Sequence, residues 1–230
     1  MSTSLEATTI AGLFFGAVED RWPGKDPSAI RKTSVSGPQK LGLTGFNGDR
    51  QADLTVHGGK DKAVHHYPVD HYTAWIEEGV MPAGTTPAAF GENISAKGFT
   101  EETVFIGDTF RIGSALLQVS QGRQPCWKLN RHTENEQMAY RFQKTGRTGW
   151  YYRVLEEGEI APGDEMTLLE RPHEDWSVKR VTQARLTKTI APEEAATLAA
   201  MDLLEEGWRA AFAKMAKGDL KENTDRRLKG

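Results

Sequence analysis

The feature that most constrains the fold is a series of short apolar segments divided by turn residues, which fills the chain as far as about residue 170. Glycine stands at the joints, as in the pairs Gly107-Asp108 and Gly163-Asp164, where it supplies the positive φ of a tight turn. Short strands separated in this way are typical of a compact β-barrel or sandwich. The expected strands are 10–18, 63–67, 104–106, 109–112, 115–120, 150–155 and 165–169.

Two helices are expected within this β-rich part. Asp70 is placed to cap a helix over 71–78, because a carboxylate at that position can accept the first backbone N–H groups. A second helix is expected to begin at 134 or 135 and to end at Gly146, since glycine readily adopts the left-handed conformation after a last turn.

The pattern changes near 171–175, where alanine becomes frequent and apolar residues take helical spacing. Three short helices are expected, over 178–186, 192–200 and 202–215. The sequence therefore predicts a mainly β protein with added helices. We expect a β-barrel domain over 1–172, followed by a small three-helix module over 173–230.

Charge and cysteine content exclude several classes. Lys and Arg number 29 against 32 Asp and Glu, so no excess of positive charge suggests a nucleic-acid polymer as partner. No apolar run approaches the ~20 residues of a membrane-spanning helix, and the polar N-terminus is unlike a signal peptide. With one cysteine no disulfide can form within the chain, and we expect a cytoplasmic protein.

That cysteine, Cys126, follows a predicted strand and is flanked by Arg123 and Lys128. Nearby positive charge favours the thiolate, which is the form that attacks electrophiles or binds soft metals. The alternative is a buried thiol that only fills space, because free cysteine is among the most buried residue types. The local sequence leaves the two alternatives about equal.

A glycine-rich stretch lies upstream, and Gly58 and Gly59 belong to it. Glycine lets the backbone approach a ligand closely, and Arg50, Lys60 and Lys62 add charge suited to a phosphate. No Gly-Lys-Ser or Gly-Lys-Thr occurs, so this is not a Walker loop. A surface hairpin with solvated charges explains the same residues equally well.

Two further polar residues are candidates. His57 precedes the two glycines and is a candidate proton donor for a reductive step, or a structural histidine bonded to a backbone carbonyl. Asn93, in a turn over 90–94, offers a donor and an acceptor to the edge of a ring, although a turn asparagine is the simpler explanation. The aromatic run 150–152 favours packing in the sheet over a stacking platform.

Taken in order, these segments resemble the MOSC family, named for the C-terminal domain of molybdenum cofactor sulfurase, and within it the YiiM-like branch. The resemblance covers roughly residues 10–170, and the helical end resembles the three-helix module that follows in that branch. One departure is Gly122, where that branch is expected to have proline. The motifs are Gly45-x-x-Gly48-Asp49-x-Gln51-Ala52, His57-Gly58-Gly59, Phe90-Gly91-Glu92-Asn93, Ile106-Gly107-Asp108 and Gln121-x-Arg123-x-Pro125-Cys126.

The resemblance implies a MOSC-type β-barrel that binds the molybdenum cofactor, a metal held by a pterin called molybdopterin. It implies reduction of N-hydroxylated compounds, including N-hydroxylated purine bases and hydroxylamines, which detoxifies base analogues. Cys126 would be the protein ligand of the metal and, with His57 as proton donor, the catalytic pair. The expected cofactor-binding residues are Arg50, His57, Gly58, Gly59, Lys60, Lys62, Asn93 and Arg123.

The implied partners are a small N-hydroxylated substrate and a separate electron-donor reductase, since the chain has no flavin or iron–sulfur motif. The apolar faces of the helical module also suggest a homodimer, although docking of these faces on the barrel explains them as well. A competing hypothesis is a carrier that binds the cofactor, or sulfur as a persulfide on Cys126, without catalysis. A third is a phosphate-binding protein in which Cys126 is merely packed.

Overall fold

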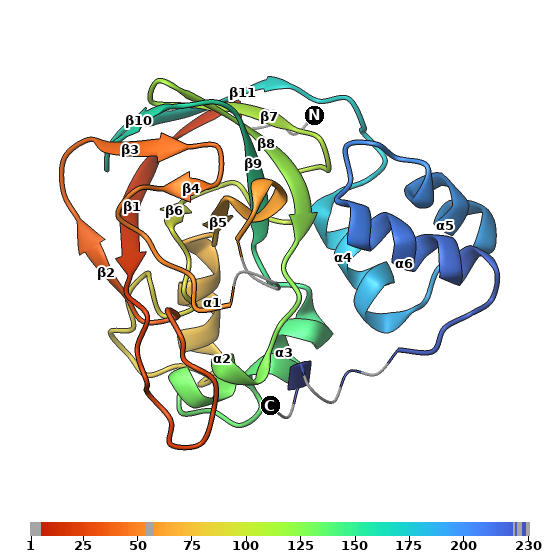
Figure 1. Cartoon of the computed structure of the whole chain (residues 1–230), viewed down its shortest axis with the longest axis horizontal. Helices are drawn as coiled ribbons and strands as arrows, with labels where there is room; N and C mark the ends of the chain where they lie inside the picture. The colour runs from red at the N-terminus through yellow and green to blue at the C-terminus, as the bar shows by residue number, and fades with distance from the viewer. Residues whose placement is uncertain (1–5, 54–57, 223, 225–226, 229–230) are drawn as a thin grey trace.

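The computed structural model describes residues 6–53, 58–222, 224 and 227–228. Its strands are β1 (Ala7–Gly16), β2 (Lys32–Val35), β3 (Gln39–Gly42), β4 (Gly45–Phe46), β5 (Val64–His66), β6 (Ile94–Ala96), β7 (Thr109–Ile112), β8 (Ala115–Gly122), β9 (Trp150–Glu156), β10 (Gly158–Ile160) and β11 (Glu165–Glu170). Seven of them close into a barrel in the order β11, β7, β8, β9, β5, β6, β1, because β1 pairs with β11 as well as with β6 (Figure 1). β2 lies on the outer edge of β1, and β10, β3 and β4 form a smaller sheet.

The side chains that point inward from each strand fill the interior of the barrel. Successive side chains of a strand point to opposite faces, so every second residue of β9 points inward. Trp150, Tyr152 and Val154 are buried in the central apolar cluster, whereas Tyr151 and Arg153 are only partly buried on the outer face. The predicted strands are confirmed where they form the barrel, except that 104–106 contributes only an isolated bridge at Phe105.

Three short helices lie at one end of the barrel: α1 (Asp70–Glu77), α2 (Trp127–His132) and α3 (Met138–Thr145) (Figure 1). The expected cap at Asp70 is wrong: Asp70 is the first helical residue, and its Oδ2 accepts a hydrogen bond from the backbone of Gly98 at 2.8 Å. The expected end of α3 is confirmed, because Gly146 adopts φ 73°. α2 was not predicted.

The chain ends with three helices beside the barrel: α4 (Val178–Thr187), α5 (Pro192–Ala199) and α6 (Glu206–Ala216) (Figure 1). α6 begins later than the predicted 202, because Glu205 caps it by accepting the backbone N–H of Trp208 at 2.9 Å. The fold class is confirmed as mainly β with a barrel followed by three helices. The domain boundary between 172 and 173 stays a prediction.

Gly122, at the end of β8, lies against Thr182 of α4. A Cβ added at Gly122 would come within 1.9 Å of Thr182 Oγ1 and 3.1 Å of Thr182 Cβ. The helical module therefore packs so closely on this strand that no side chain fits at 122. This gives a steric reason for the glycine that departs from the proline expected there.

We expect Gly122→Ala to lower the free energy of unfolding by about 1–3 kcal/mol, since overpacking forces neighbouring groups to shift. Thr182→Ala in the same chain should recover part of this loss by removing the nearest atom, Oγ1. Urea denaturation of the two single variants and the double variant measures both effects. A Gly122→Ala protein as stable as wild type would contradict the close packing.

His66 lies inside the barrel, stacked on Trp150 with ring centroids 4.3 Å apart. Burial lowers its pKa to about 3 from the ordinary 6.5, because a charged ring is disfavoured without water. As the pH falls below 6.5, His66 binds a proton in the unfolded chain but not in the folded protein. The stability that depends on neutral His66 is therefore complete above pH 6.5 and is lost progressively between 6.5 and about 3.

We expect His66→Phe to flatten this pH dependence. The phenyl ring can keep the stack on Trp150 but does not titrate, although the hydrogen bond between His66 Nδ1 and Tyr152 is lost. Between pH 7.5 and 5.0, wild type should lose about 2 kcal/mol more than the variant, at up to ~1.4 kcal/mol for each pH unit below 6.5. Urea denaturation at both pH values measures the difference, and parallel losses would contradict the assignment.

No helix within the described ranges is long and apolar enough to cross a membrane.

Candidate functional site

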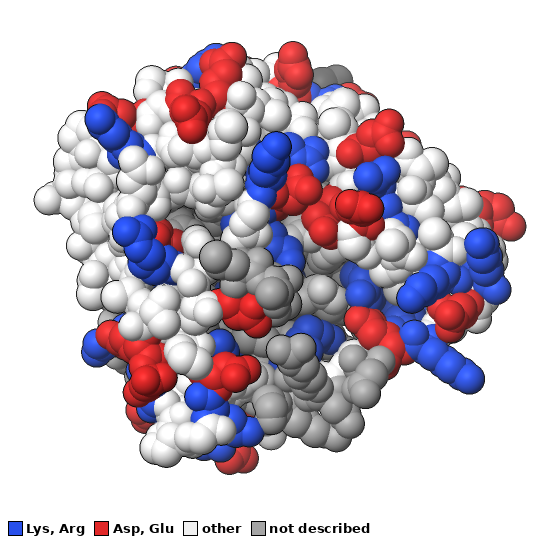
Figure 2. Space-filling model, in the orientation of Figure 1, with Lys and Arg blue, Asp and Glu red and all other residues white. Residues whose placement is uncertain are grey.

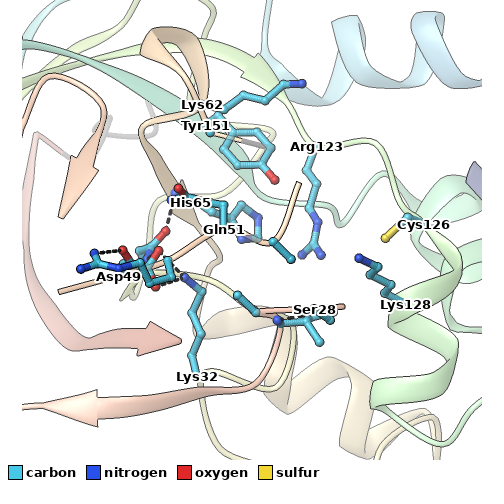
Figure 3. A pocket seen from close by; sticks show the side chains of 17 residues that line it. Ser28, Lys32, Asp49, Gln51, Lys62, His65, Arg123, Cys126, Lys128 and Tyr151 are labelled. Atoms are coloured by element: carbon cyan, nitrogen blue, oxygen red, sulfur yellow. Dashed lines mark hydrogen bonds and ion pairs between the residues drawn. The ribbon is translucent and has the colours of Figure 1, made fainter. Parts of the chain in front are cut away.

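A pocket with a cavity volume of about 90 Å³ lies on the outer side of the barrel, beside the segment that carries Cys126 (Figure 3). Segments far apart in the sequence meet here. The lining residues are 28–30, 32, 49–52, 58, 62, 65, 91, 93, 123, 126, 128 and 151.

Most of the residues predicted for a site meet in this pocket. Those that line it are Arg50, Gly58, Lys62, Asn93, Arg123 and Cys126. Gly59 and Lys60 do not line it, although Lys60 begins the short 3-10 helix η1 (Lys60–Lys62) that ends at the wall. His57 lies outside the described residues, and its role as proton donor stays a prediction.

Several lining residues are not among the predicted site residues, and Lys32, Asp49, His65 and Tyr151 are the ones that matter here. Asp49 belongs to the motif around Gly48, which by itself indicates no role for its carboxylate. Lys32 belongs to a short polar edge strand, which carries no pattern that distinguishes it from a solvated strand. The alternation of β9 is the signal that could have separated Tyr151 from its inward-facing neighbours.

Asp49 organises one end of the pocket. Its Oδ1 accepts the backbone N–H of Gly16 at 2.8 Å, and both its oxygens accept Lys32 Nζ at 2.7 Å. The side chains of Asp49 and Lys32 are only 2% and 7% exposed, so this ion pair is buried. Burial lowers the pKa of Lys32, while the facing carboxylate of Asp49 opposes that shift. A buried pair of this kind fixes the two side chains in one arrangement.

Asn93 belongs to the same network. Its amide nitrogen donates to Asp49 Oδ2 at 2.9 Å and to the carbonyl of Phe14 at 3.2 Å. Its Oδ1 accepts the backbone N–H of His65 at 3.2 Å. Both amide hydrogens are therefore used within the protein, and only Oδ1 retains capacity, as an acceptor, for a ligand.

Arg123 brings a buried positive charge to the centre of the pocket (Figure 3). Its NH1 donates to the carbonyl of Phe90 at 2.6 Å. Glu92 fixes this turn by accepting the N–H groups of Ala88 at 2.7 Å and Phe90 at 3.1 Å. Within the described part of the chain, no carboxylate forms an ion pair with Arg123. A buried guanidinium in this state is suited to an anionic ligand.

The charges in the wall are strongly unequal. The five basic residues Lys32, Arg50, Lys62, Arg123 and Lys128 face one carboxylate, that of Asp49. Burial holds the pKa of His65 well below its usual value, and the charges of Arg123 and Lys32 lower it further. His65 is therefore neutral, and the pocket favours a ligand with several negative charges.

Cys126 lies between β8 and α2, at the residue before the helix begins. Its backbone is extended, with φ −133° and ψ 165°, and its side chain is partly buried in the pocket wall. Figure 3 shows the sulfur on the same side of the pocket as Lys128, facing the guanidinium of Arg123. The expected position of Cys126 after the end of a strand is confirmed, whereas its role in a site stays a prediction.

On the face shown in Figure 2, Lys and Arg side chains are interspersed with Asp and Glu side chains, and no large patch of one sign stands out.

The fold and the pocket together define a class of protein: a closed β-barrel with a thiol at the wall of a cationic pocket. A family model for the MOSC domain matches residues 53–167. The chain belongs to this family, which is associated with the molybdenum cofactor.

Three relatives support this assignment. An uncharacterised protein of Bacillus subtilis, YflK, is 44% identical over 83% of this chain and 85% of its own length. Protein YiiM of Escherichia coli is 38% identical over 91% and 93%, and its crystal structure superposes with a TM-score of 0.77 at 31% identity, covering 96% of this chain and 99% of that one. A protein of Gibberella moniliformis named "Reductase" is 42% identical over 70% of this chain but only 30% of its own length.

Proposed function

We propose that this protein is a molybdenum-cofactor-dependent reductase of N-hydroxylated compounds, such as N-hydroxylated purine bases and hydroxylamines. The observation that carries the proposal is the position of the Cys126 thiol beside the buried Arg123, in a pocket where five basic side chains face one carboxylate. A thiolate is a ligand for soft metals, and the surrounding charge suits an anionic cofactor.

The residues present fit the molybdenum cofactor. Within the described residues, no group of three or more His, Cys, Asp and Glu side chains could hold a metal ion. Among the described residues, a metal bound at Cys126 would find few further protein ligands, and a metal held by a pterin brings its own. The pterin's phosphate and sulfur atoms carry the negative charge that the basic wall would balance.

In this proposal, the Cys126 thiolate would ligate molybdenum and Arg123 would pair with the anionic part of the cofactor. Arg50, Lys62 and the backbone of Gly58 would hold the phosphate, and Lys32 and Lys128 add positive charge to the same wall. Asn93 holds Asp49 in place and would offer a ligand only the acceptor Oδ1. When bound, the cofactor supplies the two-electron redox chemistry of molybdenum.

In the overall reaction, an N-hydroxylated amine takes up two electrons and two protons and yields the amine and water. The N–O bond breaks, and the oxygen leaves as water. Electrons would come from a separate reductase.

Protein produced in a host that makes the cofactor tests this proposal. We expect about one molybdenum per chain by mass spectrometry, and formation of adenine from N-hydroxylated adenine with a chemical electron donor. A loaded protein that reduces no N-hydroxylated substrate would favour the carrier instead. A protein that retains neither metal nor pterin would contradict the proposal and favour a different phosphate-containing ligand.

A further inference from the structure

Tyr151 is partly buried and lines the pocket, whereas Tyr67, Tyr72 and Tyr152 are buried away from it. The hydroxyl of Tyr67 donates to the carbonyl of Arg147, that of Tyr72 to Glu92, and that of Tyr152 is bonded to His66. For Tyr151, no partner for the hydroxyl is found within the described part of the chain, although the residue lines the pocket. The hydroxyl is not among the buried polar atoms that lack a partner, and it lies at the pocket, so the atom that would complete its hydrogen bonding is a water or ligand atom there.

Figure 3 shows where that atom would lie. The ring of Tyr151 stands at the wall with its hydroxyl directed into the pocket, on the side of Arg123. The sulfur of Cys126 faces the same space from across the pocket. A ligand atom held between Arg123 and Cys126 would therefore be close to this hydroxyl.

The backbone holds Tyr151 in a fixed position. Its strand pairs on both sides, with Gln121 of β8 and His65 of β5 as the facing residues. The carbonyl of Tyr151 accepts the hydroxyl of Ser120 at 3.1 Å, and its ring packs on His65 with centroids 5.0 Å apart. The hydroxyl is thus presented with little freedom, as a preorganised donor requires.

The charges around Tyr151 decide whether it donates or accepts. Burial raises the pKa of its hydroxyl, the charge of Cys126 raises it further, and Arg123 opposes the shift. The phenol therefore keeps its proton and acts as a hydrogen-bond donor, not as an acid that gives up its proton. The facing guanidinium of Arg123 and the neutral ring of His65 leave an oxygen with partial negative charge as its natural acceptor.

We propose that the Tyr151 hydroxyl donates a hydrogen bond to the oxygen of the substrate's N-hydroxyl group. Tyr151 is then a specificity-determining residue, because the amine product lacks that oxygen and leaves the hydroxyl without its partner. This inference rests on the proposed function and adds to it the residue that distinguishes substrate from product.

Tyr151→Phe removes only the hydroxyl and tests this directly. Titration calorimetry on the oxidised, cofactor-loaded protein, without an electron donor, gives the Kd of N-hydroxylated adenine and of adenine without turnover. We expect the variant to bind the N-hydroxylated compound about threefold to tenfold more weakly and adenine as wild type does, the effect of one hydrogen bond. The matched control is Tyr140→Phe, whose side chain is 63% exposed and should change neither Kd.

The outcomes separate the two proposals. If wild type holds molybdenum and is active, but Tyr151→Phe keeps the full preference for the N-hydroxylated compound, this inference alone is overturned. A variant that loses molybdenum yet keeps that preference would place the hydroxyl against the cofactor and also overturn it. Wild-type protein without molybdenum or reductase activity overturns the proposed function, and this inference with it.

Discussion

Replacing Cys126 with serine is expected to reduce molybdenum content to background and to lower reductase activity at least about a hundredfold. Serine keeps the size of the side chain but replaces a soft thiolate with a hard, protonated hydroxyl, which is a poor ligand for this metal. Outer-shell residues of metal sites already cost about 10–100-fold when mutated, so loss of the protein ligand itself should cost more.

The measurements for Cys126→Ser are metal and pterin content per chain and the rate of adenine formation. Cys126→Ala, which leaves no ligand atom, should behave in the same way. Because Cys126 is partly exposed at the pocket wall, neither variant should change the thermal midpoint of the metal-free protein by much. Full metal content in both variants, with full activity, would disprove the central claim about the thiol.

The largest effect on stability is expected from Asp49→Asn. This change leaves the positive charge of Lys32 buried without its carboxylate, and breaking a buried pair costs about 3–5 kcal/mol of the free energy of unfolding. Asparagine keeps one oxygen for the N–H of Gly16, but its amide nitrogen cannot accept the amide of Asn93, so the loss includes that hydrogen bond as well as the charge. Urea denaturation at neutral pH is the measurement.

Two comparisons make the Asp49 result specific. Lys32→Met combined with Asp49→Asn removes both charges and should recover more than half of the loss. Glu156→Gln breaks the exposed pair with Arg111 and should cost less than about 1 kcal/mol, because solvent screens such pairs. If Asp49→Asn lowers the free energy of unfolding no more than Glu156→Gln does, the Asp49–Lys32 pair behaves as an exposed pair and contributes little to stability.

The barrel strands could be predicted because their pattern is local. On β9 each inward side chain is apolar, and the glycines at 107 and 163 adopt the positive φ expected of them. The cysteine, Arg123 and the glycine-rich segment could be named because their residue types indicate chemistry wherever they stand. Their meeting in one pocket is visible only in the folded chain.

The parts that could not be predicted depend on contacts between residues that are far apart in the sequence. Lys32 is held at the pocket by its ion pair with Asp49, which follows it by 17 positions and meets it only in the folded chain. α2 has six residues and no side-chain cap, so no signal in the sequence indicates it. Tyr151 stands in an aromatic run whose other members pack inside, and its different surroundings come from the register with His65.

The pairing of β1 with β11 governs the order in which the protein can form. Ala7 is the register partner of Thr167, so the ring of strands cannot close until nearly three quarters of the chain has been made. Contacts this distant in sequence require costly loop closure and slow the search for the native state. During synthesis, β1 therefore has an unpaired edge until β11 has been made. Lys32 and Asp49 belong to the segment that is synthesised before this closure. The interval before closure is therefore when a newly made chain is most exposed to aggregation and most dependent on chaperones.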